Sequence, residues 1–136
     1  MHSPLPPTVL FSVLLSALLL NGCGSGGPEL GSVSGTVTLD DRPLPDAIVE
    51  FQPASGSPSE GVTDSAGSYQ LRYTAKKKGA LLGKHQVRIT LSTRADAHGQ
   101  KVDVPQLLPA RYNRNTELTA EVRSGSNKLD FPLKSK

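Results

Sequence analysis

Apolar and polar residues alternate along most of the chain after residue 30, which is the pattern of strands with one buried face. The turn-forming segment Asp64–Gly67 closes a short strand at Gly61–Thr63. Six further strands are predicted from alternating positions: Val33–Leu39; Ala47, Val49 and Phe51; Tyr69, Leu71 and Tyr73; His85, Val87, Ile89 and Leu91; Leu118, Ala120 and Val122; and Leu129, Phe131 and Leu133.

Segments rich in Asp, Pro, Gly and Ser separate these strands at Asp40–Pro43, Pro53–Pro58 and Ser124–Asn127. No stretch has the three-and-four spacing of an amphipathic helix, and Ala75–Leu82 allows a single helical turn at most. Seven short strands with frequent turns predict one all-β domain over residues 30–136. The expected architecture is a seven-stranded antiparallel β-sandwich, because two packed layers bury the alternating faces together.

Several linked motifs share one pattern: Gly35–Val37, Arg42–Phe51, Thr63–Leu71, Gly83–Ile89, Pro109–Asn113 and Asn127–Phe131. Together they resemble carboxypeptidase regulatory-like domains, which belong to the transthyretin-like, immunoglobulin-like sandwiches. The resemblance covers Gly31–Lys134, and the chain is similar to small secreted planctomycete lipoproteins that carry such a domain. It implies a sandwich fold and says little about function, since one fold serves many functions.

The first 22 residues contain no Asp, Glu, Lys or Arg, and Val9–Leu20 is apolar apart from two serines. This run is shorter than the roughly 20 residues that a membrane-spanning helix needs. It has the length of the apolar core of a secretory signal. We therefore expect residues 1–22 to be a signal peptide.

The segment Leu20-Asn21-Gly22-Cys23 resembles the lipobox of bacterial lipoproteins. The resemblance implies that Cys23 is the lipid attachment site, with a diacylglyceryl group on sulfur and a fatty acid such as palmitate on the new amine. Residues 23–29 then form a flexible tether. In lipoproteins of this kind an Asp directly after the cysteine commonly signals retention at the inner membrane; residue 24 is Gly, which favours the outer membrane. The alternative is an ordinary secretory signal with a cysteine nearby by chance.

Composition excludes several classes of partner. The chain has one cysteine, so an internal disulfide is impossible. It has no Trp, 4% aromatic residues and a formal net charge of +3. These values argue against nucleic acid as a partner, and against an aromatic platform for sugars. Tyr69 and Tyr73 share the face of Leu71, so we expect them to be buried.

Candidate catalytic and metal-binding residues are few, and we predict no catalytic residue, no metal site and no cofactor. His85 alternates with apolar strand residues and is expected to be structural, whereas His98 belongs to a polar loop. The transthyretin-like hydroxyisourate hydrolases end in Tyr-Arg-Gly-Ser, but this chain ends at Pro132–Lys136. An enzyme would need His85 and an acidic residue to meet in a cleft. We attribute the aspartates around 40–46 and at 64 to turns instead of to a calcium site.

Two other features have a structural and a functional interpretation. Lys76-Lys77-Lys78 forms the densest charge cluster, which we interpret as a solvated connection. The alternative is contact with anionic lipid headgroups or a cell-wall polymer. Tyr112 precedes a strand, and we expect its hydroxyl to tie a corner to backbone.

Together these patterns predict a non-enzymatic, lipid-anchored protein of the bacterial cell envelope, held on the periplasmic side of a membrane through Cys23. Its β-sandwich would be a binding or structural module for an envelope protein or polymer. The alternative function is a carbohydrate- or cell-wall-polymer-binding module.

Overall fold

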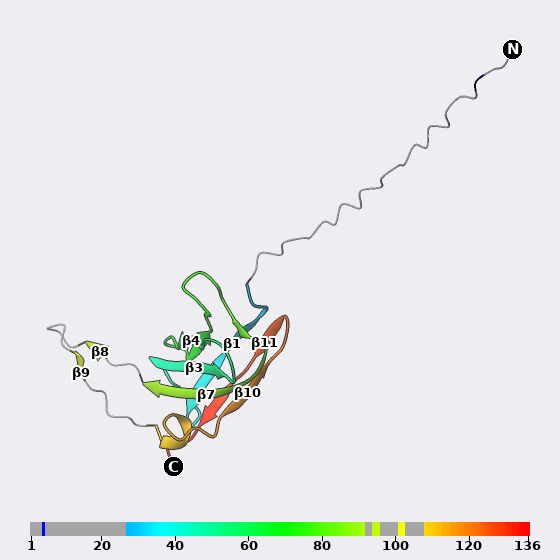
Figure 1. Ribbon diagram of the computed structural model, residues 1–136. Helices are drawn as coiled ribbons and strands as arrows, with labels where there is room; N and C mark the ends of the chain where they lie inside the picture. Colours follow the sequence, from blue (N-terminus) through cyan, green and yellow to red (C-terminus); the bar gives the residue numbers. More distant parts are fainter. Residues whose placement is uncertain (1–3, 5–26, 92–93, 96–100, 103–107) are drawn as a thin grey trace.

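The computed structural model describes residues 4, 27–91, 94–95, 101–102 and 108–136. These residues form an all-β domain with one short 3-10 turn and no α-helix. No helix in the described ranges is long and apolar enough to cross a membrane. The elements (Figure 1) are β1 (Leu30–Leu39), β2 (Arg42–Pro43), β3 (Ala47–Pro53), β4 (Ser59–Val62), β5 (Ser68–Gln70), β6 (Ala80–Leu81), β7 (Gly83–Leu91), β8 (Arg94–Ala95), β9 (Lys101–Val102), η1 (Ala110–Tyr112), β10 (Thr119–Val122), β11 (Ser126–Lys128) and β12 (Phe131–Leu133).

The longest strand, β1, is the centre of the first sheet. On one side it pairs antiparallel with three short strands in succession, β6, β5 and β2. On its other side it pairs parallel with β11 and then β12. The alternation in β1 separates buried Val33 and Val37 from exposed Ser32 and Ser34. One strand therefore joins five others into a layer.

The second sheet has the order β10-β7-β3-β4 and is antiparallel throughout. Its edge strand β4 is connected to the first sheet by a bridge in which Glu60 and Arg72 exchange two backbone hydrogen bonds of 3.0 and 2.9 Å. This bridge covers one open edge of the sandwich, where unpaired backbone groups would otherwise be exposed to other chains. Strands β8 and β9 pair with each other.

The inner faces of the two sheets enclose a single apolar core. Phe51 of β3 contacts Phe131 of β12, with ring centroids 6.0 Å apart in an edge-to-face arrangement, which is a favourable geometry for aromatic pairs. Tyr69 packs against Phe131 at 6.3 Å. The buried apolar residues are Val33, Val37, Ala47, Val49, Phe51, Tyr69, Leu71, Ala80, Val87, Ile89, Leu108, Tyr112, Val122, Phe131 and Leu133.

The predicted fold class is confirmed: the chain forms an all-β sandwich of two sheets. The sheet order adds a parallel component, since β11 and β12 run in the same direction as β1. The chain leaves β10 in the second sheet and crosses to the first, so it arrives beside β1 with that orientation.

Three local predictions differ from the structure. Ser126–Lys128 forms strand β11, although we assigned Ser126 and Asn127 to a turn; Gly125, with φ of +92°, completes the turn earlier. Strand β5 ends at Gln70, so Tyr73 lies beyond it and is half-buried. The segment 75–82 contains bends and strand β6 in place of a helical turn.

Gly35 occupies the point where the first sheet is most crowded. Its partner on β5 is Tyr69, whose hydroxyl donates a 2.5 Å hydrogen bond to the Leu129 carbonyl on the opposite side of β1. The Tyr69 side chain therefore crosses β1 over Gly35. Burial, followed by the charge of Asp130, raises the pKa of this phenol above its ordinary value. A methyl group at residue 35 would lie 1.9 Å from the Leu129 oxygen.

The pairing of β1 with β11 and β12 is interrupted beside Gly35, and an aspartate side chain replaces the missing backbone hydrogen bond. Asp130 accepts a 2.9 Å hydrogen bond from the Thr36 amide, and the Thr36 hydroxyl lies 3.2 Å from the same oxygen. Leu129 donates its own amide to the Ser34 carbonyl at 2.8 Å. Backbone groups at the interruption are thus hydrogen-bonded.

The aspartates assigned to turns have left-handed backbone conformations. Asp40, Asp41 and Asp46 have φ of 50°, 66° and 58°, which Asp tolerates better than most residues. In the 64–67 turn, Asp64 accepts hydrogen bonds from the amides of Ala66 and Ser68 at 2.9 and 3.0 Å. These side chains stabilise the connections as turn formers do.

The C-terminal segment is held by several polar contacts. The Tyr112 hydroxyl accepts a 3.0 Å hydrogen bond from the Lys134 amide, which confirms the predicted role of Tyr112. Arg111 lies over the Tyr112 ring and donates to the Lys134 carbonyl at 3.0 Å. The Ser135 hydroxyl and amide both donate to Asp40, and these bonds lower the pKa of that carboxyl from its ordinary value.

We predict that Gly35→Ala lowers the free energy of unfolding by about 3 kcal/mol, because the added methyl group overlaps a backbone oxygen that cannot move without breaking two hydrogen bonds. Chemical denaturation followed by circular dichroism measures this effect. The control is Ser34→Ala on the exposed face of the same strand, which should change stability by less than about 0.5 kcal/mol. Equal stability of the two variants would contradict the packing described at Gly35.

Candidate functional site

The outward face of the second sheet carries a row of polar side chains in direct register. Gln52 of β3 pairs with Gln86 of β7, and Gln86 pairs with Thr119 of β10. Because side chains alternate between the faces of a sheet, all three point away from the core. Gln86 and Thr119 are exposed and Gln52 is half-buried.

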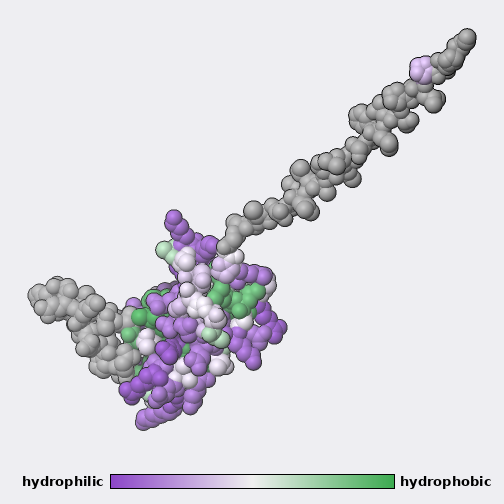
Figure 2. Space-filling model, in the orientation of Figure 1, coloured by the Kyte–Doolittle hydropathy of each residue, from purple (hydrophilic) through white to green (hydrophobic). Residues whose placement is uncertain are grey.

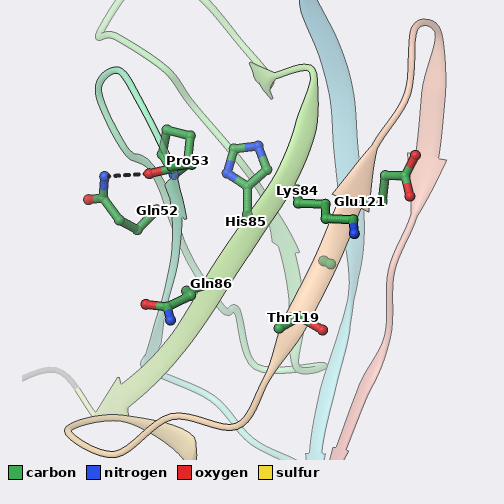
Figure 3. A pocket seen from close by; sticks show the side chains of 9 residues that line it. Gln52, Pro53, Lys84, His85, Gln86, Thr119 and Glu121 are labelled. Carbon is green, nitrogen blue, oxygen red and sulfur yellow. Dashed lines mark hydrogen bonds between the residues drawn. The ribbon is translucent and has the colours of Figure 1, made fainter.

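A groove of about 850 Å³ lies at this row (Figure 3). Its lining combines two amides, a hydroxyl, a cation and a carboxylate with a comparable area of apolar surface. The lining residues are Gln52, Pro53, Ala54, Lys84, His85, Gln86, Thr119, Ala120 and Glu121. The groove is therefore a mixed polar and apolar site supported by three strands.

Most of the polar groups in the groove are not used by the fold. Gln52 donates to the Pro53 carbonyl at 3.1 Å. In the described part of the chain, the Gln86 and Thr119 side chains have no hydrogen-bond partner. Lys84 lies in register with Glu121 without an ion pair, and Glu121 is 3.9 Å from Arg123 in an exposed contact worth little. These donors and acceptors remain accessible to a ligand.

His85 belongs to the opposite face of β7 and is buried, with 3% of its surface exposed. Its ring lies 5.6 Å from the Phe51 ring, and Nε2 is 2.7 Å from the Leu81 carbonyl oxygen. Because a carbonyl oxygen only accepts hydrogen bonds, this contact assigns a proton to Nε2, while Nδ1 is buried without a partner. The prediction of a packed structural histidine is confirmed.

The groove does not bring His85 together with an acidic side chain, although both His85 and Glu121 line it. In Figure 3 the Glu121 carboxylate lies on the far side of Lys84 from the His85 ring and points away from it. Among the described residues, no group of three or more His, Cys, Asp or Glu side chains is positioned to hold a metal ion. The lining suits binding by hydrogen bonds better than acid–base chemistry.

A second hollow of about 440 Å³ lies farther along β7, between the outward face of the sheet and the segment around η1. Arg88 and Arg114 line it together with Asn113, which donates to the Ile89 carbonyl at 3.3 Å. Asn113 thus fastens the η1 segment to β7. Neither hollow was predicted from the sequence.

The remaining sequence candidates are distributed away from the groove. Cys23 and His98 lie outside the described residues, so lipid attachment stays a prediction. Lys76, Lys77 and Lys78 are exposed on the connection between β5 and β6. Tyr69 is buried as expected, and Tyr73 is half-buried, so the two do not form an exposed aromatic platform.

No protein-family model and no curated protein matches the chain, so the resemblance to carboxypeptidase regulatory-like domains stays a prediction. Among solved structures, a DUF3823 family protein from Parabacteroides merdae is similar, with 9% identity and a TM-score of 0.41 over 78% of this chain and 46% of that one. A 9R-lipoxygenase from Cyanothece is similar with 18% identity and a TM-score of 0.42, over 78% of this chain and 16% of that one. The chain thus spans less than half of either protein.

We predict that His85→Ala lowers the free energy of unfolding by about 3 kcal/mol, because it removes a buried ring and leaves a cavity beside Phe51. Gln86→Ala, one residue along the same strand, should change it by less than about 0.5 kcal/mol. Denaturant titration of both variants measures the difference. A large loss for Gln86→Ala would show that the groove face is structural.

Proposed function

We propose that the protein is a lipid-anchored, non-catalytic binding module of the bacterial cell envelope, and that the groove on β3, β7 and β10 is its binding face. The single observation that carries the proposal is the row of Gln52, Gln86 and Thr119 in direct cross-strand register. The fold does not use the last two side chains. A rigid sheet therefore presents spaced amide and hydroxyl groups to the surroundings.

The chemistry of this row favours a hydroxyl-rich ligand, such as a cell-wall polymer or another glycan. Each amide offers a donor and an acceptor to a hydroxyl group. Lys84 and Glu121 extend the site with charges of both signs. Because no exposed aromatic ring lines the groove, recognition rests on hydrogen bonds, each worth about 0.5–1.5 kcal/mol.

The anchor is proposed from the sequence, through the resemblance of Leu20–Cys23 to a lipobox. Cys23 lies four residues before Gly27, where the described domain begins. Two or three acyl chains hold a protein on a membrane far more durably than one chain. We place the domain on the periplasmic side, and the residue after Cys23 favours the outer membrane.

The absence of catalysis is also part of the proposal. The His85 ring is packed against Phe51 in the core, and the Glu121 carboxylate in the groove points away from that ring. The groove pairs Lys84 with Glu121 in register but holds no nucleophile beside a base, which catalysis by a protein side chain requires.

We predict that the double variant Gln52→Ala/Gln86→Ala binds purified cell-wall polymer about 10-fold more weakly than the parent, because two hydrogen-bonding amides are lost. Co-sedimentation with isolated sacculi measures the affinity. Gln70→Ala is the matched control, since Gln70 is an exposed strand glutamine of the other sheet. Binding that is unchanged in the double variant, or lowered equally by Gln70→Ala, would contradict the assignment of the groove.

We predict that Cys23→Ser moves the protein from the membrane fraction to the soluble fraction when the membranes are washed at high salt, because the acceptor of the acyl chains is lost and exposed charges are screened. Fractionation together with metabolic labelling by a palmitate analogue tests this, and intact-mass spectrometry gives the number of chains. A membrane-bound parent with an unmodified thiol would refute the anchor.

A further inference from the structure

Three consecutive lysines are displayed at the end of the sandwich where the tether enters. We call Thr74–Lys78 the lysine tip. Lys76, Lys77 and Lys78 are all exposed. Among the described residues, none of the three forms an ion pair. The tip is therefore a compact group of free positive charges.

The lysine tip has a fixed shape instead of being a loose connection. The Thr74 hydroxyl accepts hydrogen bonds from the amides of Lys76 and Lys77, at 3.3 and 3.0 Å. Tyr73 donates its amide to the Lys77 carbonyl at 2.8 Å, and Arg72 and Lys78 form an antiparallel bridge below the turn. This local hydrogen bonding pre-organises the three charges, which reduces the entropy lost when they bind.

The position of the tip beside the tether follows from independent contacts. A methyl group on Gly27 would lie 2.5 Å from Lys77 Nζ, so this tether residue adjoins the Lys77 side chain. Strand β6, which follows the tip, pairs with Leu30 and Gly31 at the start of β1. Figure 1 shows the same arrangement: the loop after β5 and the entering chain lie at one end, and the C-terminus lies at the other.

The rest of this end matches a membrane surface. Leu82, directly after β6, is one of two large apolar side chains exposed in the described part, with 37% of its surface accessible. Glu29 also lies near this end, and its carboxylate accepts a 3.2 Å hydrogen bond from the Ser124 hydroxyl. Figure 2 shows purple hydrophilic surface and a green hydrophobic area near the point where the chain enters the domain. Lysines next to an exposed leucine are typical of surfaces that contact lipid headgroups.

We infer that the lysine tip docks on the anionic lipid headgroups of the membrane to which the chain is anchored, an inference that rests on the proposed lipid on Cys23. The four residues from Cys23 to Gly27 span at most about 14 Å. This reach is comparable to the Debye length of about 8–10 Å, the distance over which exposed charges still interact. The tip is therefore held close enough to the membrane to be attracted by its charges. The tether brings the membrane to this end of the domain, whereas nothing comparable brings an anionic cell-wall polymer there.

The first experiment separates docking from acylation. It uses residues 23–136 carrying Cys23→Ser; this chain keeps the core, since every buried apolar residue that the structure describes lies between Val33 and Leu133. Binding is measured by co-sedimentation with phosphatidylcholine vesicles, with and without phosphatidylglycerol. We expect salt-sensitive binding only to the vesicles that contain phosphatidylglycerol.

The decisive comparison is between two variants with equal charge. Lys76→Gln/Lys77→Gln/Lys78→Gln and the control Arg114→Gln/Lys134→Gln/Lys136→Gln each lower the formal net charge from +3 to zero. We expect the tip variant to lose about 10-fold to 100-fold in binding, as three headgroup contacts are removed, and the control to retain most of it. Equal losses in the two variants, or no loss in the tip variant, would overturn the inference.

The second experiment uses the acylated protein in the same vesicles and maps lysine labelling by a membrane-impermeant reagent. We expect Lys76–Lys78 to be protected when phosphatidylglycerol is present, while Lys134 and Lys136 are labelled equally in both. Docking would be refuted if the tip were labelled equally with and without phosphatidylglycerol, or if the protein bound sacculi but not vesicles. An unmodified Cys23 together with tip-dependent vesicle binding would instead refute the anchor and leave docking intact.

Discussion

The sandwich depends on the absence of a side chain at residue 35. Strand β1 carries five neighbours, and at Gly35 the Tyr69 ring crosses it to reach the Leu129 carbonyl. The same carbonyl approaches so closely that a Cβ atom would overlap it. Around this point Asp130 replaces the interrupted ladder by binding the Thr36 amide. The first sheet can therefore assemble on both sides of β1 only because this position is bare.

The two faces of the second sheet differ: one is packed in the core, and the other carries the groove that we propose as the binding face. Inward residues such as Val87, Ile89 and His85 fill the core, while the outward residues between them carry amides and charges. Since neighbouring residues on a strand point to opposite faces, a change in the groove row leaves the packing below it intact. Proteins with this layout can differ in their outward residues, and so in the ligand they bind, while the core residues stay the same. Fold alone therefore says little about function.

Alternation in the sequence was enough to predict the layers and most of the core. It assigned Val33, Val37, Val49 and Phe51 correctly to buried faces, because each strand reports its own inward side. It failed at Ser126–Lys128, where a polar strand is stabilised by pairing with β1. The groove could not be predicted, because it depends on the cross-strand register of Gln52, Gln86 and Thr119. That register cannot be read from the sequence alone.

The parallel pairing of the terminal strands has a mechanical consequence. The tether leads into the start of β1, and the C-terminus follows β12, which lies beside β1 and runs in the same direction. Tension between the two ends of the domain would slide these strands past each other along their axes. Their hydrogen bonds would then share the load in shear instead of unzipping one at a time. A module stretched between a membrane and a distant attachment would resist being pulled open.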